Sequence, residues 1–111
     1  MALTEKQLCQ RRDNDTNTHA MYGPPANTIA IIRTIVIANT TGSSATIRLF
    51  LDDDGSTYDE STAMMYDVPI PANTTIQLDG FYPMNDPDGN LAYQQGTANA
   101  LTVTVFGVEI T

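Results

Sequence analysis

The chain has 111 residues, of which 41% are hydrophobic, and a formal net charge of −8 at neutral pH. This length and composition are enough for one domain with one core. The acidic balance argues against nucleic acid and against an anionic membrane as partners, because both need clustered lysine and arginine. The single cysteine, Cys9, cannot form an intrachain disulfide.

The N-terminus lacks the apolar stretch of a secretory signal, and the longest apolar run, residues 29–38, is too short to span a bilayer. We therefore expect the chain to be made in a reducing cytoplasm and to stay there until something releases it.

Residues 1–16 differ from the rest of the chain, because they carry equal numbers of basic and acidic side chains, whereas residues 17–111 carry the whole net charge. Thr4 as N-cap, with Gln7 three residues later, could begin a short helix. Its two leucines form too thin a stripe to be buried alone, so the segment is either loosely ordered or docked on a partner. We interpret it as an extended or short-helical docking arm. Its expected partner contacts are Leu3, Leu8, Arg11 and Arg12.

From Thr18 onward the pattern is that of β-strands. Residues 28–39 form the strongest strand, and because isoleucines occur on both of its sides, we expect a central strand covered on two faces. A turn is expected at residues 86–89, where proline presets φ and glycine accepts a left-handed conformation. The predicted strands cover residues 19–22, 28–39, 45–51, 63–68, 74–79, 91–94 and 101–111.

The last predicted strand changes phase. Leu101, Val103 and Val105 share one side, whereas Phe106 and the apolar residues after it share the other, with Gly107 near the change. This pattern predicts a bulge or bend at the glycine and a second surface beyond it, facing a neighbouring subunit. Seven short strands with no convincing helix predict an all-β fold, an antiparallel β-sandwich or jelly-roll-like domain over residues 17–111.

No residue pattern predicts a catalytic, cofactor or metal site. The acidic loop at residues 52–60 does not have the EF-hand spacing, because a glycine at position six would put Phe50 at position one. A solvated turn is the favoured interpretation. The lone histidine, His19, is expected on an edge strand or at the surface, and Cys9 as a small contact residue. One histidine and one cysteine cannot supply a zinc site.

Methionine and aromatic residues cluster in two places, at residues 64–66 and 81–84. Strand alternation buries about half of such a run, so some of these side chains face outward. Exposed Met and Tyr are typical of protein interfaces. From these clusters and the last strand, the predicted partner contacts are Met65, Phe81, Tyr82 and Phe106.

Four segments, taken in order, carry a resemblance: residues 23–42 (Gly-Pro-Pro-Ala-Asn-Thr through Asn-Thr-Thr-Gly), 54–59 (Asp-Gly-Ser-Thr-Tyr-Asp), 68–75 (Val-Pro-Ile-Pro-Ala-Asn-Thr-Thr) and 98–111. In order and spacing, the chain resembles small β-sandwich structural proteins of tailed-phage virions over roughly residues 22–111. None of these motifs is specific alone.

The resemblance implies a virion structural role in homo-oligomers, commonly trimers, and supplies no catalytic residues. We expect a capsid decoration (cement) protein, assembled in the host cytoplasm and bound to the major capsid protein or another virion protein. The alternative is a neck, tail or tail-fibre component that contributes to assembly or host adsorption, for example by binding a surface glycan through Tyr and Asp loops. An enzyme such as a polysaccharide depolymerase would need a fixed carboxylate pair, which no pattern in the sequence provides.

Overall fold

The structure is a computed structural model that describes residues 2–85 and 89–111. The turn predicted at residues 86–89 therefore falls mostly outside the described residues. The strands are β1 Leu3–Arg11, β2 His19–Tyr22, β3 Ile29–Asn39, β4 Ala45–Asp52, β5 Ala63–Ile70, β6 Thr75–Asn85, β7 Asn90–Gln95 and β8 Leu101–Ile110, with one short 3₁₀ helix, η1 Glu60–Thr62.

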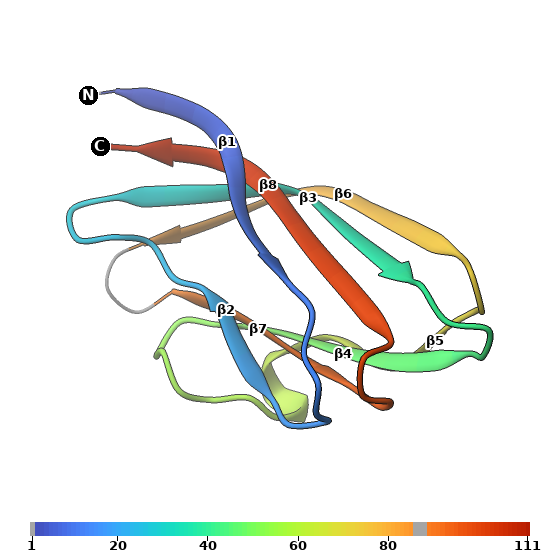
Figure 1. Cartoon of the computed structure of the whole chain (residues 1–111). Helices are drawn as coiled ribbons and strands as arrows, with labels where there is room; N and C mark the ends of the chain where they lie inside the picture. The colour runs from blue at the N-terminus through green and yellow to red at the C-terminus, as the bar shows by residue number, and fades with distance from the viewer. Residues whose placement is uncertain (1, 86–88) are drawn as a thin grey trace.

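The strands form two antiparallel four-stranded sheets that pack face to face (Figure 1). Sheet A has the order β1-β8-β3-β6 and sheet B the order β2-β7-β4-β5. The strands pair in a nested order: β1 with β8, β2 with β7, β3 with β6 and β4 with β5. Successive pairs alternate between sheet A and sheet B. This is the jelly-roll arrangement of a β-sandwich, and the predicted fold class is confirmed.

The N-terminal segment is a strand of sheet A. β1 pairs antiparallel with β8, and Ala2 and Thr111 exchange two backbone hydrogen bonds of 2.9 and 3.0 Å. The short helix expected from Thr4 is therefore wrong, and the extended alternative is correct. Within the described residues there are eight strands rather than about seven. Periodicity missed β1 because most of its side chains are exposed, so its place depends on the backbone ladder and not on an apolar face.

The strand predicted over residues 74–79 is longer in the structure, where β6 continues to Asn85. Gly80 and Pro83 lie within it, and both residues usually end a strand. Pro83 pairs with Ile31 of β3. A proline is tolerated there because β6 is an edge strand, where one side of the backbone needs no partner.

The core lies between the inner faces of the two sheets. Strand alternation turns every second residue inward, as expected for a half-buried pleated sheet. The largest contributions come from the central strands of each sheet. Fully buried members include Ile32, Ile35, Ile37, Ile47, Leu49, Leu91, Tyr93, Leu101, Val103 and Val105.

Cys9 provides a test of how firmly β1 is docked. Its side chain packs against the core, and burial raises the pKa of the thiol to about 11, against a smaller opposing effect of the Arg11 charge. A thiol reacts as its thiolate, so at pH 8 the native protein should react with dithionitrobenzoate roughly a hundredfold more slowly than the urea-unfolded chain. Equal rates would show that residues 1–16 detach as an arm. The domain boundary would then lie between residues 16 and 17, as the sequence predicted.

β8 keeps one alternation from end to end, so the predicted bulge is not in this strand. The irregularities lie in both neighbours instead. The register of β1 shifts between Gln7 and Cys9, and the register of β3 shifts between Ile32 and Thr34. Both shifts lie beside Gly107, so the sequence marked the right level of the sheet but the wrong strand.

Gly107 is required because the neighbouring backbone approaches it closely. A Cβ atom at this position would lie 2.1 Å from the carbonyl oxygen of Ile31 and 2.8 Å from Cδ1 of Leu8. The first of these atoms is backbone and cannot move without displacing β3. The glycine therefore permits the tight contact among β1, β8 and β3.

We expect Gly107→Ala to lower the free energy of unfolding by roughly 3 kcal/mol or more, because the added methyl group forces β3 away. Urea unfolding followed by circular dichroism measures this change. Gly42→Ala is the matched control, since a Cβ there meets no atom within 4 Å. Equal stability of the two variants would contradict the close approach.

Candidate interaction surfaces

The outer face of sheet A is apolar at the end where both termini lie (Figure 1). The registers of β1, β8, β3 and β6 align these side chains in successive cross-strand rows. Their neighbours along the strands, such as Ala30, Ile32 and Val105, are fully buried, so alternation turns the rows outward. We call this surface the outer apolar patch: Leu3, Ile29, Ile31, Phe81, Pro83, Phe106, Val108 and Ile110.

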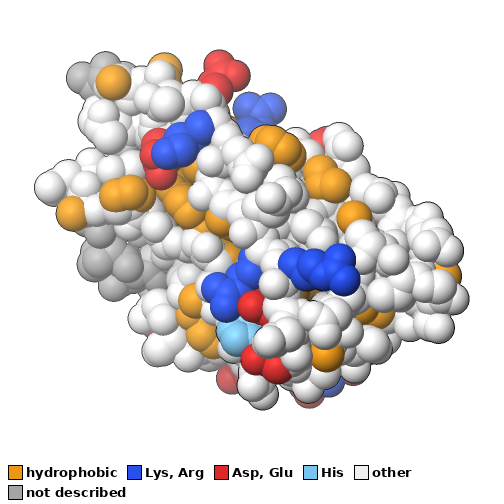
Figure 2. All heavy atoms as spheres, viewed as in Figure 1, with side chains coloured by type: hydrophobic (Ala, Val, Ile, Leu, Met, Phe, Trp, Pro, Cys, Tyr) orange, Lys and Arg blue, Asp and Glu red, His pale blue; other side chains and the backbone are white. Residues whose placement is uncertain are grey.

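Four members of the outer apolar patch are strongly exposed: Leu3 at 66%, Phe81 at 62%, Ile29 at 44% and Phe106 at 40%. Hydrophobic side chains are visible at the surface over this end of the molecule (Figure 2). Farther along the same face most outward residues are polar, including Thr75, Gln77, Thr102 and Thr104, with Val36 half-buried among them. A contiguous apolar patch of this kind marks an interaction site more often than scattered single residues do.

A groove of about 590 Å³ borders the patch and is lined by Glu5, Lys6, Gln7, Arg33, Phe106, Gly107 and Val108. The Arg33 guanidinium lies 5.9 Å from the centre of the Phe81 ring, and its Nε donates to the carbonyl oxygen of Gly80 at 3.1 Å. This contact holds an exposed phenylalanine in place on the outer face.

The coverage predicted for β3 is corrected. Its inward isoleucines are buried, but Ile29 on the other side remains exposed, so the strand is central in its sheet and covered on one face. An apolar pattern on both sides of a strand predicts burial on both sides. In the described part of this chain no element covers the outer side of β3. Apolar residues on both sides of a strand that is covered on one side only are therefore the sequence signal for the patch.

The structure brings together three of the eight residues predicted to bind a partner: Leu3, Phe81 and Phe106. It places three others differently, because the side chains of Leu8, Met65 and Tyr82 pack against the core. Packing accounts for the apolar character of these three without a partner. Val108 and Ile110 belong to the second surface that the sequence predicted beyond Phe106. Ile29, Ile31 and Pro83 were not predicted as contacts, because the two isoleucines were expected to be covered and the strand of Pro83 was expected to end at Asp79.

The two arginines predicted as partner contacts have partners within the chain. Arg12 donates to Oγ1 of Thr40 at 2.8 Å and to the carbonyl oxygen of Asn99 at 2.6 Å. Arg11 donates through Nε to both carboxylate oxygens of Asp13, at 2.8 and 2.9 Å. Arg12 therefore ties the connection between β1 and β2 to other loops of the domain, whereas Arg11 braces the connection itself.

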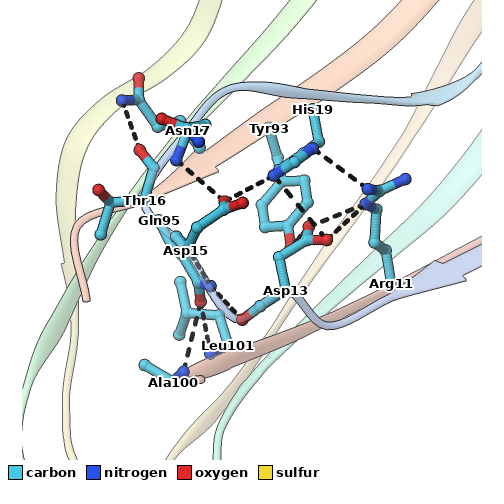
Figure 3. Close-up of polar contacts among 11 residues, drawn as sticks. Arg11, Asp13, Asp15, Thr16, Asn17, His19, Tyr93, Gln95, Ala100 and Leu101 are labelled. Atoms are coloured by element: carbon cyan, nitrogen blue, oxygen red, sulfur yellow. Dashed lines mark hydrogen bonds and ion pairs between the residues drawn. The ribbon is translucent and has the colours of Figure 1, made fainter. Parts of the chain in front are cut away.

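Arg11 and Asp13 belong to a polar cluster that also contains Asp15, His19, Tyr93 and Gln95 (Figure 3). The Tyr93 hydroxyl donates to Asp13. Nε2 of His19 lies 2.6 Å from Oδ1 of Asp15, and Nδ1 lies 3.1 Å from a guanidinium nitrogen of Arg11. Because arginine can only donate, Nδ1 must accept and Nε2 must carry the proton. Both ring nitrogens are engaged, which leaves neither for activating a nucleophile.

Gln95 closes the cluster from beneath. Its Nε2 donates to the carbonyl oxygens of Asp13 at 2.7 Å and Asp15 at 3.0 Å. Its Oε1 accepts from the backbone N–H groups of Leu101 at 3.0 Å and Ala100 at 3.4 Å. One buried amide thus joins the β1–β2 connection to the start of β8, and a buried network satisfied in this way is rigid.

The cluster makes the stability of the protein depend on pH. Burial raises the pKa of Asp13, but hydrogen bonds from Arg11 and Tyr93, with the Arg11 charge, outweigh burial and hold the pKa below its ordinary value. A carboxyl group whose pKa is lowered by folding stabilises the native state above its unfolded pKa of about 4. That contribution disappears as pH falls through the folded pKa.

We expect Asp13→Ala to lower the free energy of unfolding near pH 7 by about 2 kcal/mol, because it leaves Arg11 and Tyr93 without their acceptor. The loss should be smaller at pH 3, because that pH lies below the unfolded pKa of about 4 and the advantage of the ionised carboxyl group is then reduced. Urea titrations at the two pH values measure both effects. Asp53→Ala, in the exposed loop, is the control and should change neither. A loss of the same size at both pH values would contradict the assignment.

The outer face of sheet B carries a second candidate surface. Phe50 and Ala92 pair across β4 and β7 and face outward, yet both are buried. The rings of Tyr58 and Tyr66 cover Phe50, with ring centres 6.3 and 6.5 Å away. Beside this cover lies a groove of about 430 Å³, which we call the aromatic groove. It is lined by Arg48, Phe50, Tyr58, Asp59, Glu60, Ser61, Tyr66 and Gln94.

The acidic loop is organised by its own backbone. Asp54 accepts from the N–H groups of Ser56 and Thr57, each at 2.9 Å, and these bonds with the Thr57 hydroxyl lower its pKa to about 2. Asp52 is 6% exposed and accepts from the Thr57 N–H at 2.8 Å, while burial raises its pKa. Within residues 2–85 and 89–111, no three His, Cys, Asp or Glu side chains gather as a metal would require.

No family model matches the chain, and no curated protein matches it by sequence. Among solved structures, a chain described under "Bacillus endospore appendages form a novel family of disulfide-linked pili" superposes with a TM-score of 0.54 at 13% identity, covering 98% of this chain and 88% of that one. A chain of infectious bursal disease virus, Gx strain, gives a TM-score of 0.51 at 8% identity, covering 97% and 30%. This chain therefore spans under a third of the viral one.

At such low identity these similarities show the fold alone: both neighbours share the β-sandwich. Of the residues described, none lie in a helix long and apolar enough to cross a membrane.

Proposed function

We propose that this protein is a structural subunit of a bacteriophage virion, and that it acts as a capsid decoration (cement) protein without enzymatic activity. The observation that carries the proposal is the outer apolar patch. A chain with a net charge of −8 repels its own copies and other acidic surfaces at long range, so attachment must come from close apolar contact. The patch supplies such contact on the outer face of one sheet.

Two further observations support a structural role. The order of segments along the sequence resembles small structural proteins of tailed-phage virions. The jelly-roll fold is shared with a chain from spore pili and a chain from a virus, although the similarity extends to the fold only. In the proposed role the partners are the major capsid protein, or another virion protein, and further copies of this chain in a trimer. The site of action is the virion, assembled in the host cytoplasm.

The patch is suited to both kinds of contact. Its rows run across four strands of a single sheet, so a partner meets a surface whose shape does not depend on loops. Its exposed members include two phenylalanines, and large apolar rings at the centre of an interface contribute most of the binding energy. The surrounding polar residues of sheet A provide a rim.

The alternative is a neck or tail component that contributes to assembly or host adsorption. The aromatic groove on sheet B is the observation that favours it, because this groove faces away from the patch and stays open when the patch is covered. Copy number separates the two roles. A cryo-EM reconstruction of the parent particle would show decoration proteins distributed over the whole shell, and a neck or tail component only at the single tail vertex.

The double variant Phe81→Asp, Phe106→Asp should lose binding to expanded phage heads that lack the protein, by at least about a hundredfold in Kd, because it buries two unpaired charges in the contact. Cosedimentation measures the loss. Light scattering after gel filtration should also show a smaller oligomer. Deleting residues 1–16 is a poorer test, since it removes β1 from its sheet.

Gln77→Asp is the matched control, because it adds a charge to the polar part of the same face. It should bind heads as the wild type does, and all variants should keep the wild-type circular dichroism spectrum. Undiminished binding by the double variant would overturn the proposal, as would an equal loss in the control.

A further inference from the structure

The aromatic groove is built by a local irregularity of β5. The register between β4 and β5 shifts after Ile47, so that Tyr66 and Asp67 together stand opposite Arg48. Asp67 has a φ of 54°, in the left-handed region that a non-glycine residue seldom adopts. Bulges of this kind re-aim side chains, and backbone held in a sparsely populated conformation is often found at functional sites.

The bulge delivers Tyr66 and Asp67 to the same arginine. The guanidinium of Arg48 lies 4.1 Å from the centre of the Tyr66 ring. Two nitrogens of the same guanidinium donate to the two carboxylate oxygens of Asp67, at 2.7 and 3.1 Å. The Phe50 ring meets Tyr66 edge-on at 6.5 Å. The exposed tyrosine is therefore held by contacts on two sides before any ligand arrives.

Groups able to bind a polar ligand surround this ring. Tyr66 is 40% exposed. Glu60 is exposed at the start of η1, and Asp59 uses Oδ1 to accept from Ser61, which leaves Oδ2 available. The groove volume of about 430 Å³ lies in the range of small-ligand sites. A sugar ring has apolar C–H faces and hydroxyl donors at its edge. A fixed aromatic ring beside free carboxylate acceptors matches both features.

The charges of the groove select among sugars. Arg48 is neutralised by Asp67, whereas Asp59 and Glu60 have no basic partner within hydrogen-bonding distance in the described chain. The unpaired carboxylates of Asp59 and Glu60, together with the net charge of −8, repel carboxylated or phosphorylated saccharides, nucleic acid and acidic peptides. A neutral saccharide has no such penalty.

We propose that the aromatic groove binds a neutral glycan, with one sugar ring against Tyr66 and its hydroxyl groups donating to Glu60 and Asp59. The inference goes beyond the proposed virion role and holds for either location of the protein. A shallow site with one exposed ring binds weakly, with a Kd on the order of 0.1–1 mM. Several copies on one particle would raise the effective affinity through multivalency.

Saturation-transfer NMR with tri-N-acetylchitotriose and maltotriose as neutral probes, and trigalacturonic acid as an anionic probe, tests the proposal. At least one neutral probe should receive saturation, and the anionic probe should receive none. Tyr66→Ala should weaken binding at least about tenfold, because the stacking surface is lost. Tyr66→Phe should keep most of the binding, and Glu60→Gln should weaken it a few-fold.

Phe81→Ala, on the outer face of sheet A, is the control and should bind sugar normally. The two proposals then fail separately: variants of the outer apolar patch lose head attachment and keep sugar binding, whereas Tyr66→Ala does the reverse. Absence of saturation transfer to both neutral probes overturns the inference, as does binding unchanged by Tyr66→Ala or confined to the anionic probe. If Tyr66→Ala instead abolishes head attachment, the groove is a protein contact and the inference is wrong.

Discussion

The contact of β8 with both β1 and β3 is the constraint on which the rest of the structure depends. At Gly107 the backbone of β3 comes so close that no side chain fits, and the registers of both neighbouring strands shift there. β1 buries little and is held mainly by its ladder with β8. Because β8 joins the first strand to the centre of sheet A, it aligns the rows that make up the outer apolar patch. If this contact is lost, the patch loses its geometry even where the core survives.

Most of the positively charged side chains form ion pairs with acidic residues of the same chain. Lys6 is paired with Glu109, Arg11 with Asp13 and Arg48 with Asp67. An exposed pair such as Arg48–Asp67 contributes little to stability. All three pairs leave few cations for attracting a partner. The two outer faces of the sandwich therefore differ in chemistry. Sheet A exposes apolar side chains, and sheet B exposes a ring beside carboxylates. In the proposed roles, one face attaches the subunit to protein while the other stays free for a polar ligand.

The strands with regular alternation could be predicted from the sequence because that signal is local. Residues 45–51 show it clearly, and so does the start of the last strand. β1 lacks the signal, since its residues are mostly polar and its stability comes from hydrogen bonds to a strand about 100 residues away. The strand predicted to end at Asp79 continues through Pro83 to Asn85, and the proline is tolerated because this strand lies at a sheet edge. Gly107 was a correct sign of irregular backbone, but a glycine cannot show which of three adjacent strands carries the bulge.

The sequence by itself determined an acidic, all-β domain, and it marked Leu3, Phe81 and Phe106 as residues for a partner. Only the tertiary structure decided that these three share one face, because that depends on register across four strands. It also decided that Phe50 is buried on the outside of its sheet, and that Tyr66 is aimed onto Arg48 by a bulge. Composition and periodicity act over a few residues, whereas strand register and bulges are set by pairing between distant segments, and the surfaces follow from the pairing.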